Sequence, residues 1–300
     1  MPDDHTPTAS PSGPGAGTAA PSIGIIFANI GGLGTAEGAS ALAEACDRHG
    51  IESVWTVEHV VVPKGYESTY PYSRDGRMPG DEASPIPDPL VWLTWVAARS
   101  ERVRLATGVL ILPQRNPAIL AKEVATLDQL SGGRVTLGVG VGWLEEEFNA
   151  LGVPFADRGR RTDEAIEALR ALWTEETSTY EGRHHRFRDV LSFPKPAQGS
   201  VPIVVGGHSE AAARRAGRLG DGFFPGRHDG IEHLVETMRA TAEAAGRDPD
   251  SIELTVGAPR RPEDRQRFLD LGARRFVIPP PALDADGIDA AIERTLDQLA

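Results

Sequence analysis

Residues 103–141 read VRLATGVLIL, PQRN, PAILAKEVATLDQL, SGG and RVTLGVGV in succession. The first and last runs, 103–112 and 134–141, are almost continuously apolar, which is typical of parallel strands whose two faces are both covered. The amphipathic run between them begins at Pro117, and proline is well tolerated in the first turn of a helix. The segment therefore predicts a strand, a helix over 117–130 and a second strand parallel to the first.

The same alternation of apolar and amphipathic runs continues outward in both directions. Before residue 103, apolar runs at 23–27 and 53–57 precede helical patterns at 38–49 and 88–100. After residue 141 come a helical pattern at 159–173 and four strand–helix pairs: 202–205 with 209–219, 222–224 with 231–245, 252–256 with 262–271, and 275–278 with 287–299. About eight such units fit an α/β protein of the closed (β/α)8 TIM-barrel class better than an open sheet.

Two insertions interrupt this rhythm, one after the second strand and one after the fourth strand–helix unit. The first, 63–87, is rich in Pro, Tyr and Gly and is either a lid or a loop without fixed structure. The second, 180–202, is predicted to be a hairpin or an extended surface segment. Residues 1–22 consist mainly of Pro, Ser, Thr, Gly and Ala and predict a flexible tail, which leaves 23–300 as one barrel domain.

The composition excludes several classes of function. The chain has 31 Lys+Arg and 43 Asp+Glu, a formal net charge of −12, which argues against binding of nucleic acid or an anionic membrane. A single cysteine, Cys46, excludes an intramolecular disulfide and a cysteine metal cluster. No apolar run approaches the ~18 residues that a membrane span needs. We expect a cytoplasmic protein that acts on a small molecule.

In a barrel of this class the chemistry lies at the C-terminal ends of the strands. Glu58 and His59 follow the second strand, and a histidine titrates near neutral pH, which suits donation or withdrawal of a proton. The alternative is a structural histidine with all its hydrogen bonds made. Neighbouring residues on a strand point to opposite faces, so Glu58 and His59 need not touch each other.

Glycines stand at two other strand ends. Gly206, Gly207, His208 and Ser209 combine close backbone approach with a good helix N-cap, which predicts an anion site; a tight turn with a capping serine is the alternative. The glycines at 138, 140 and 142 do not have the spacing of a dinucleotide fingerprint. The pair His184-His185 is interpreted as solvated surface, and no metal site is expected.

With these motifs the chain resembles luciferase-like flavin or deazaflavin oxidoreductases, and more narrowly their F420-dependent branch. The resemblance covers about 23–299 and implies the same barrel. It rests on Glu58-His59, Thr107-Gly108-Val109, the run 112–117, the run 138–143 and Gly206–Ser209.

The resemblance also implies roles for individual residues. His59 matches a histidine near the reactive ring atoms, and Glu58 matches its polar neighbour. Thr107, Gly108 and Val109 match a bulge that holds a non-prolyl cis peptide behind the flavin ring. Gly206, Gly207, His208 and Ser209 match the loop that binds the cofactor phosphate in the family. Gly142 and Trp143 would line the ring site, and Trp143 stands where the family's sugar-phosphate dehydrogenases have a carboxylate, which argues against a sugar phosphate as substrate.

The activity implied is hydride transfer between coenzyme F420 and a small organic substrate. The alternatives are a monooxygenase using reduced FMN and O2 on the same barrel, and a flavin-binding protein without turnover. A homodimer is expected because family members often form one.

Overall fold

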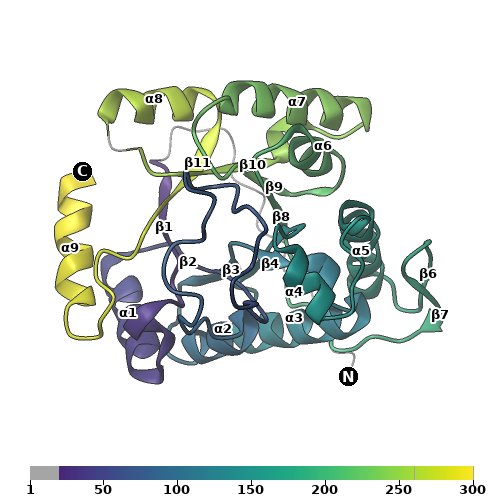
Figure 1. Cartoon of the computed structure of the whole chain (residues 1–300), viewed down its shortest axis with the longest axis horizontal. Helices are drawn as coiled ribbons and strands as arrows, with labels where there is room; N and C mark the ends of the chain where they lie inside the picture. Colours follow the sequence, from purple (N-terminus) through teal and green to yellow (C-terminus); the bar gives the residue numbers. More distant parts are fainter. Residues whose placement is uncertain (1–19, 260, 300) are drawn as a thin grey trace, which may run out of the picture.

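Parallel strands form a closed ring in the computed structural model, which describes residues 20–259 and 261–299. In ring order they are β1 (Ser22–Ile26), β2 (Ser53–Thr56), β3 (Arg104–Thr107) continued by β4 (Leu110–Ile111), β5 (Val135–Gly140), β8 (Ile203–Gly206), β9 (Gly222–Phe224), β10 (Glu253–Gly257) and β11 (Ala273–Ile278). β1 pairs with both β2 and β11, and β3 pairs with β5, so the ring has no free edge (Figure 1). The predicted (β/α)8 TIM barrel is confirmed.

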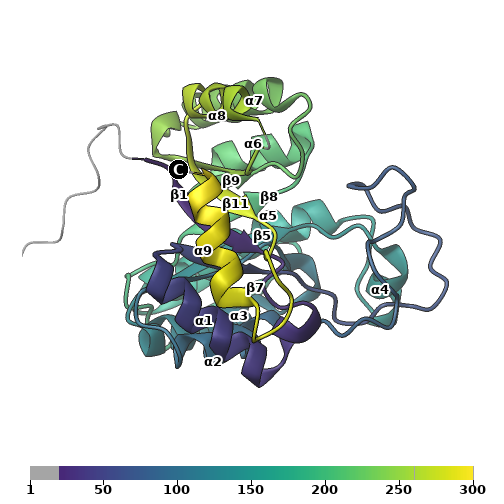
Figure 2. The same cartoon turned by 90° about the vertical axis from the view of Figure 1, so that its left-hand side faces the viewer.

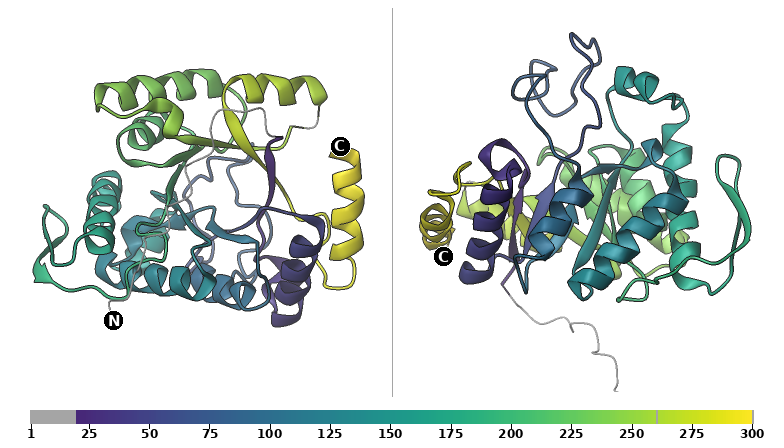
Figure 3. Two further views of the ribbon diagram at one scale, coloured as in Figure 1. Left: turned by 180° about the vertical axis from the view of Figure 1, so that it is seen from behind. Right: turned by 90° about the horizontal axis from the view of Figure 1, so that it is seen from below.

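Helices cover the outside of the ring, as Figure 3 shows from behind and from below. They are α1 (Ala36–His49), α2 (Pro89–Ala97), α3 (Pro117–Ser131), α5 (Arg158–Thr174), α6 (Glu210–Leu219), α7 (Ile231–Ala244), α8 (Pro262–Asp270) and α9 (Ile288–Leu299). Asp88 and Asn116 accept hydrogen bonds from first-turn amides just before Pro89 and Pro117, which explains where α2 and α3 begin. A short helix, α4 (Glu145–Ala150), and three 3-10 turns were not predicted.

The barrel has a small apolar interior and a cluster of charged side chains at its bottom, the end that carries the N-termini of the strands. Trp55 and Phe224 meet edge to face inside the ring, with centroids 5.7 Å apart. The Arg275 guanidinium lies 5.4 Å from the Trp55 ring and pairs with Glu52 and Glu253, which lie at the N-terminal ends of the strands. This ion cluster lies at the N-terminal ends of the strands, opposite the end at which barrels of this class carry their sites.

The third barrel strand is not continuous, although the sequence predicts one strand over 103–112. The chain leaves the sheet after Thr107, passes through a cis peptide between Gly108 and Val109, and rejoins it as β4. The non-prolyl cis peptide that the family resemblance implied is thus present.

The predicted insertion around 180–202 contains an antiparallel hairpin, β6 (Ser178–Glu181) and β7 (Arg186–Val190), beside α5 in Figure 1. The interpretation of the pair His184-His185 as solvated surface was wrong. The His184 side chain is only 6% exposed, and its Nδ1 lies 3.5 Å from Asp157 Oδ2, because the hairpin turn folds against the start of α5. His185 is half-buried, and its Nε2 is fully buried.

Residues 1–19 of the predicted flexible tail lie outside the described residues, and Ser22, its last residue, already belongs to β1. No described helix combines the length and the apolarity needed to cross a membrane. The segment between β2 and α2 and the helix α4 project from the same end of the barrel, as Figures 2 and 3 both show. That end carries the carboxyl ends of the strands and is called the mouth below.

Candidate functional site at the barrel mouth

Asn29, three residues beyond the end of β1, holds together the two ends of the segment between β2 and α2. Its Nδ2 donates to the carbonyl oxygens of Val57 (2.9 Å) and Pro87 (3.2 Å), and its Oδ1 accepts from the Val57 N–H at 2.9 Å. The side chain is fully buried, where each unmade hydrogen bond would cost about 1–3 kcal/mol. Asn29 therefore fixes the backbone that leads into Glu58 and His59.

His59 is held by a buried carboxylate from another part of the chain. Its Nδ1 lies 2.9 Å from Oε2 of Glu147 on α4, and the two side chains are 7% and 0% exposed. The other oxygen, Oε1, accepts from the N–H groups of Val60 (2.7 Å) and Val61 (3.3 Å). A carboxylate beside Nδ1 favours the tautomer with its proton there, which leaves Nε2 as the atom that can take up or release a proton.

Glu58 does not share this arrangement, in agreement with the expectation that the two neighbours need not touch. Its carboxylate accepts from the Ile111 N–H at 2.5 Å and from Arg115 Nε at 3.1 Å. Burial raises the pKa of Glu58 above its ordinary value, although the Arg115 charge and hydrogen bonds act in the opposite direction. These contacts tie the start of the segment after β2 to β4 and to the segment that follows β4, so the geometry makes Glu58 a residue that fixes the backbone of the mouth.

Trp143 is the centre of an aromatic cluster over the mouth. Its ring meets those of His59, Tyr66 and Tyr70 edge to face, at centroid distances of 5.6, 5.3 and 5.2 Å. Both tyrosines belong to residues 63–87, called the lid loop below. The structure thus brings two predicted site residues, His59 and Trp143, into contact and covers them with the lid loop.

Glu146, next to Glu147 on α4, anchors the lid loop. It accepts from the N–H groups of Glu67 (2.7 Å) and Ser68 (3.0 Å) and from the Ser68 hydroxyl (2.6 Å). The Ser68 hydroxyl and these amides lower the pKa of Glu146 to about 2, so the anchor is ionised throughout the neutral range. Consecutive glutamates therefore hold two different parts of the mouth.

The bulge after β3 forms a small apolar floor at the mouth. A Cβ placed on Gly140 would lie 2.5 Å from Val109 Cγ2, and one on Gly206 would lie 2.4 Å from Val109 Cγ1. The Val109 side chain therefore sits between the ends of β5 and β8, and only glycine fits on either side of it. The Thr107 hydroxyl donates to the Gly138 carbonyl at 2.6 Å, so it is used within the barrel wall.

Gly142 is required for a different reason from Gly140 and Gly206. Its φ is +78°, and a Cβ there would lie 2.7 Å from the Phe148 ring. A side chain at this position would therefore push α4, and with it Glu147, away from the barrel.

The predicted anion loop, Gly206 to Ser209, has its expected local structure with one difference. Ser209 caps α6 by accepting from the Ala212 N–H at 3.2 Å, and Gly207 has a φ of +130°. The Gly207 N–H, however, donates to the Phe224 carbonyl at 3.1 Å. Donors for an anion are therefore the amides from His208 into the first turn of α6, where helix N–H groups have no intrahelical acceptor.

Tyr72 of the lid loop reaches this anion loop. The His208 backbone hydrogen-bonds the Tyr72 hydroxyl. The Tyr72 ring packs so closely on Gly226 that a Cβ there would lie 2.3 Å from a ring atom. Burial raises the pKa of Tyr72, so the hydroxyl is neutral near pH 7. An anion at the His208 amide would have to replace Tyr72, so its binding requires this part of the lid loop to move.

Glu147 and Glu146 were missed in the sequence, together with the helix that carries them. The available signal was a run of three glutamates, 145–147, which follows Gly142-Trp143-Leu144 and precedes the apolar Phe148. A helix of six residues is too short for a clear periodic pattern. The partner of Glu147, His59, is 88 positions away, so no local pattern could have joined them.

Comparisons with known proteins identify relatives of this chain. A model of the luciferase-like monooxygenase family matches residues 9–268. An uncharacterized protein of Mycobacterium bovis is 34% identical over 280 residues, 92% of this chain and 97% of its own. An F420-dependent glucose-6-phosphate dehydrogenase of Kineococcus radiotolerans is 35% identical over 71% of this chain and 60% of its own.

Among solved structures, the monooxygenase RslO1 of Streptomyces bottropensis superposes with a TM-score of 0.62 at 29% identity, covering 92% of this chain and 81% of its own. The family match spans most of the chain, and the Mycobacterium bovis relative is similar over nearly its full length. The chain belongs to the luciferase-like monooxygenase family.

Proposed function

We propose that this protein is an F420-dependent oxidoreductase that transfers a hydride to or from a small organic substrate at the barrel mouth. The observation that carries the proposal is the pairing of His59 with the buried Glu147 beside Trp143. A histidine held in one tautomer at the open end of a barrel is suited to proton transfer. The F420-dependent relative from Kineococcus radiotolerans supports the choice of cofactor.

The residues at the mouth fit a flat ring that carries an anionic tail. Val109 offers an apolar floor in a gap that only glycines leave open, and the amides after Gly207 offer donors to a phosphate. Gln114, on the segment after β4, has both amide atoms buried and without a hydrogen-bond partner among the described residues. His208 Nδ1 is likewise buried without a hydrogen-bond partner among the described residues. A polar ligand at the mouth would supply hydrogen bonds to these atoms.

Bound F420 would supply a carbon, C5 of its ring, that accepts or releases the hydride. The chain's own residues orient the reactants, exclude water and move the proton. His59 exchanges a proton through Nε2, Glu147 keeps the imidazole in place, and Trp143 gives the substrate an apolar wall. The lid loop, anchored by Glu146, shields this space from water.

A second candidate is a monooxygenase that uses reduced FMN and O2, because RslO1, a monooxygenase by name, is 29% identical. Reduced FMN reacts with O2, whereas the carbon at position five makes reduced F420 unreactive toward it. This difference separates the two candidates experimentally.

Titration of the purified chain with each cofactor, followed by fluorescence, tests the proposal. We expect F420 to bind at least about tenfold more tightly than FMN, a difference of about 1.4 kcal/mol. We also expect no oxygen uptake above the spontaneous rate when reduced FMN is added. Tighter binding of FMN together with enzyme-dependent oxygen uptake would favour the monooxygenase. Binding of neither cofactor would refute both assignments.

We also propose that the chain forms a homodimer through α2 and α3, which lie side by side. Val91 of α2 is 72% exposed, and Ile119 and Leu130 of α3 are 61% and 69% exposed. Burial of such large apolar side chains is a common driving force for association. Light scattering should give twice 32.1 kDa for the native chain and the monomer mass for Ile119→Glu/Leu130→Glu. Leu283→Glu, at an exposed leucine elsewhere, is the control. A monomeric native chain would refute the proposal.

A further inference from the structure

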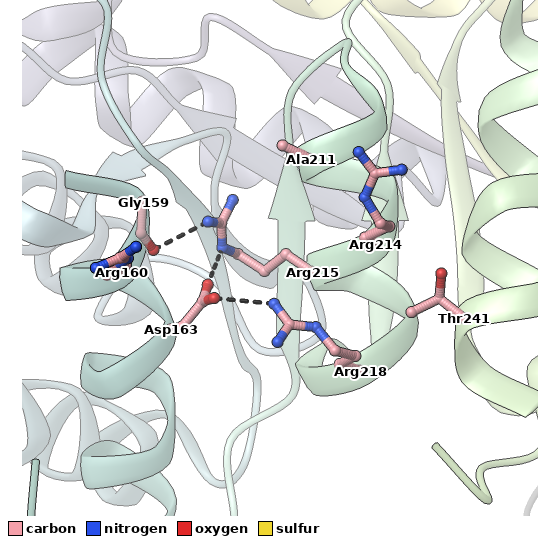
Figure 4. Close-up of a pocket in the computed structure, with 8 residues that line it drawn as sticks. All are labelled: Gly159, Arg160, Asp163, Ala211, Arg214, Arg215, Arg218 and Thr241. Atoms are coloured by element: carbon pink, nitrogen blue, oxygen red, sulfur yellow. Dashed lines mark hydrogen bonds and ion pairs between the residues drawn. The ribbon is translucent and has the colours of Figure 1, made fainter. Parts of the chain in front are cut away.

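A groove lined by arginines lies on the outside of the barrel, between the first turns of α5 and the length of α6 (Figure 4). It has a volume of about 490 Å³. Gly159, Arg160 and Asp163 line one side, and Arg214, Arg215 and Arg218 line the other. None of these residues takes part in the site described above.

The arginines of the groove are not equivalent. Arg215 is only 8% exposed; it pairs with Asp163 and donates to the Gly159 carbonyl at 2.9 Å, so it joins α6 to α5. Arg218 shares the same carboxylate at 2.9 Å. Asp163 therefore serves two guanidinium groups at once, and the base of the groove keeps an excess of positive charge.

The two remaining arginines are the exposed ones. Arg214 is 52% exposed and pairs with Glu210, which also accepts from His233. Arg160 is exposed and makes no ion pair within the described part of the chain. A surface with this excess of cations stands out on a protein with a formal net charge of −12. The groove is therefore suited to an anionic ligand.

The groove begins where the anion loop ends. Ser209 caps α6, and Ala211, two residues further on, lines the end of the groove nearest the strand ends. The N-termini of α5 and α6 both lie at this end, and their dipoles favour negative charge there. A ligand whose phosphate lies at the anion loop could continue over the rim of the barrel into the groove.

We propose that this groove binds the oligoglutamyl tail of F420, with Arg160 and Arg214 pairing with its carboxylates. The proposal rests on the proposed function and extends it. FMN ends at its phosphate, whereas F420 continues beyond its phosphate into a chain of glutamates, each with a carboxylate. The groove thus provides a recognition element that FMN cannot use, and it acts at a distance from the reacting atoms.

The test is a fluorescence titration of the full chain with F420 bearing no glutamate and with F420 bearing several. We expect the glutamylated form to bind more tightly and its affinity to fall with added salt. Arg160→Gln/Arg214→Gln should weaken binding of the glutamylated form by roughly five- to tenfold, the sum of two exposed ion pairs. Binding of the form without glutamates should not change.

Arg239→Gln is the matched control, because Arg239 is an exposed arginine of α7 that pairs with Asp250 outside the groove. Equal affinity of both cofactor forms, with no effect of the double substitution, would overturn the tail site and leave the proposed function intact. Failure of both forms to bind the native chain would overturn the proposed function and the tail site together. An equal loss for Arg239→Gln would show a general charge effect and would also overturn the tail site.

Discussion

Glu147→Gln is expected to lower kcat about 10²-fold or more, although Glu147 is not itself placed to touch the substrate. One oxygen of the carboxylate accepts from the Val60 N–H and the other faces His59 Nδ1. A glutamine has only one acceptor oxygen. If that oxygen serves Val60, its NH2 group faces Nδ1, and the imidazole must place its proton on Nε2. The histidine then presents the wrong tautomer to the reaction.

The positioning role has signatures that a purely structural role would lack. Cofactor affinity, KM and the thermal unfolding midpoint should change little, whereas kcat should fall, because the substitution changes the tautomer of the histidine and not the binding surfaces. His59→Gln should cause a loss of similar size, and the double variant little further loss, because the pair acts as one unit. Glu145→Gln, an exposed residue of the same helix, is the control and should behave like the native chain. Full activity of Glu147→Gln would contradict the assignment of His59 as the proton-transfer group.

Arg275→Met is expected to reduce the free energy of unfolding by about 2–3 kcal/mol, because Glu52 and Glu253 lose hydrogen bonds to a charged partner but, at 26% and 40% exposed, regain part of their hydration. The Arg275 side chain is 6% exposed, and it bonds Glu52 at 2.7 and 2.9 Å and also pairs with Glu253. Methionine keeps much of the side-chain volume of arginine but removes the guanidinium that both carboxylates share at the bottom of the barrel. Urea unfolding followed by circular dichroism measures the difference.

The loss should depend on pH. Burial raises the pKa of Glu52, but the hydrogen bonds and charge of Arg275 outweigh it and hold that pKa below its ordinary 4.5. An acid whose pKa is lowered by folding adds stability above its ordinary pKa, and this contribution disappears as the pH falls through the folded value. The difference between native chain and variant should therefore shrink below about pH 4.5. Arg274→Ala, at the exposed neighbouring position, is the control. A difference of less than ~1 kcal/mol at pH 7 would show that the cluster contributes little.

Much of the fold could be predicted because its signals are local. Prolines at 89 and 117 mark helix starts, and both are preceded by the Asp and Asn that cap them. Apolar runs gave the strands to within a few residues. The break after Thr107 was hidden, because an apolar run looks the same whether or not the backbone leaves the sheet inside it.

The site could be predicted only in part. The positions of the strand ends placed His59 and residues 206–209 at the mouth, because the ends of parallel strands meet at one edge whatever the loops do. The family resemblance added Trp143. Neither showed that the lid loop packs on Trp143 or that the Gly207 amide is used by Phe224. Those contacts depend on how the loops fold back.

By itself, then, the sequence determined the order and type of the eight strand–helix units and the closed barrel, since each unit follows from the spacing of apolar residues, caps and turns within short windows. Only the tertiary structure decided that Glu147 holds His59, that Tyr72 reaches the anion loop, and that four arginines of two helices form one groove. The physical reason is that barrel closure brings together residues far apart in the chain. Which charged groups pair depends on their distance and burial in the folded chain, and the order of residues in the sequence contains neither quantity.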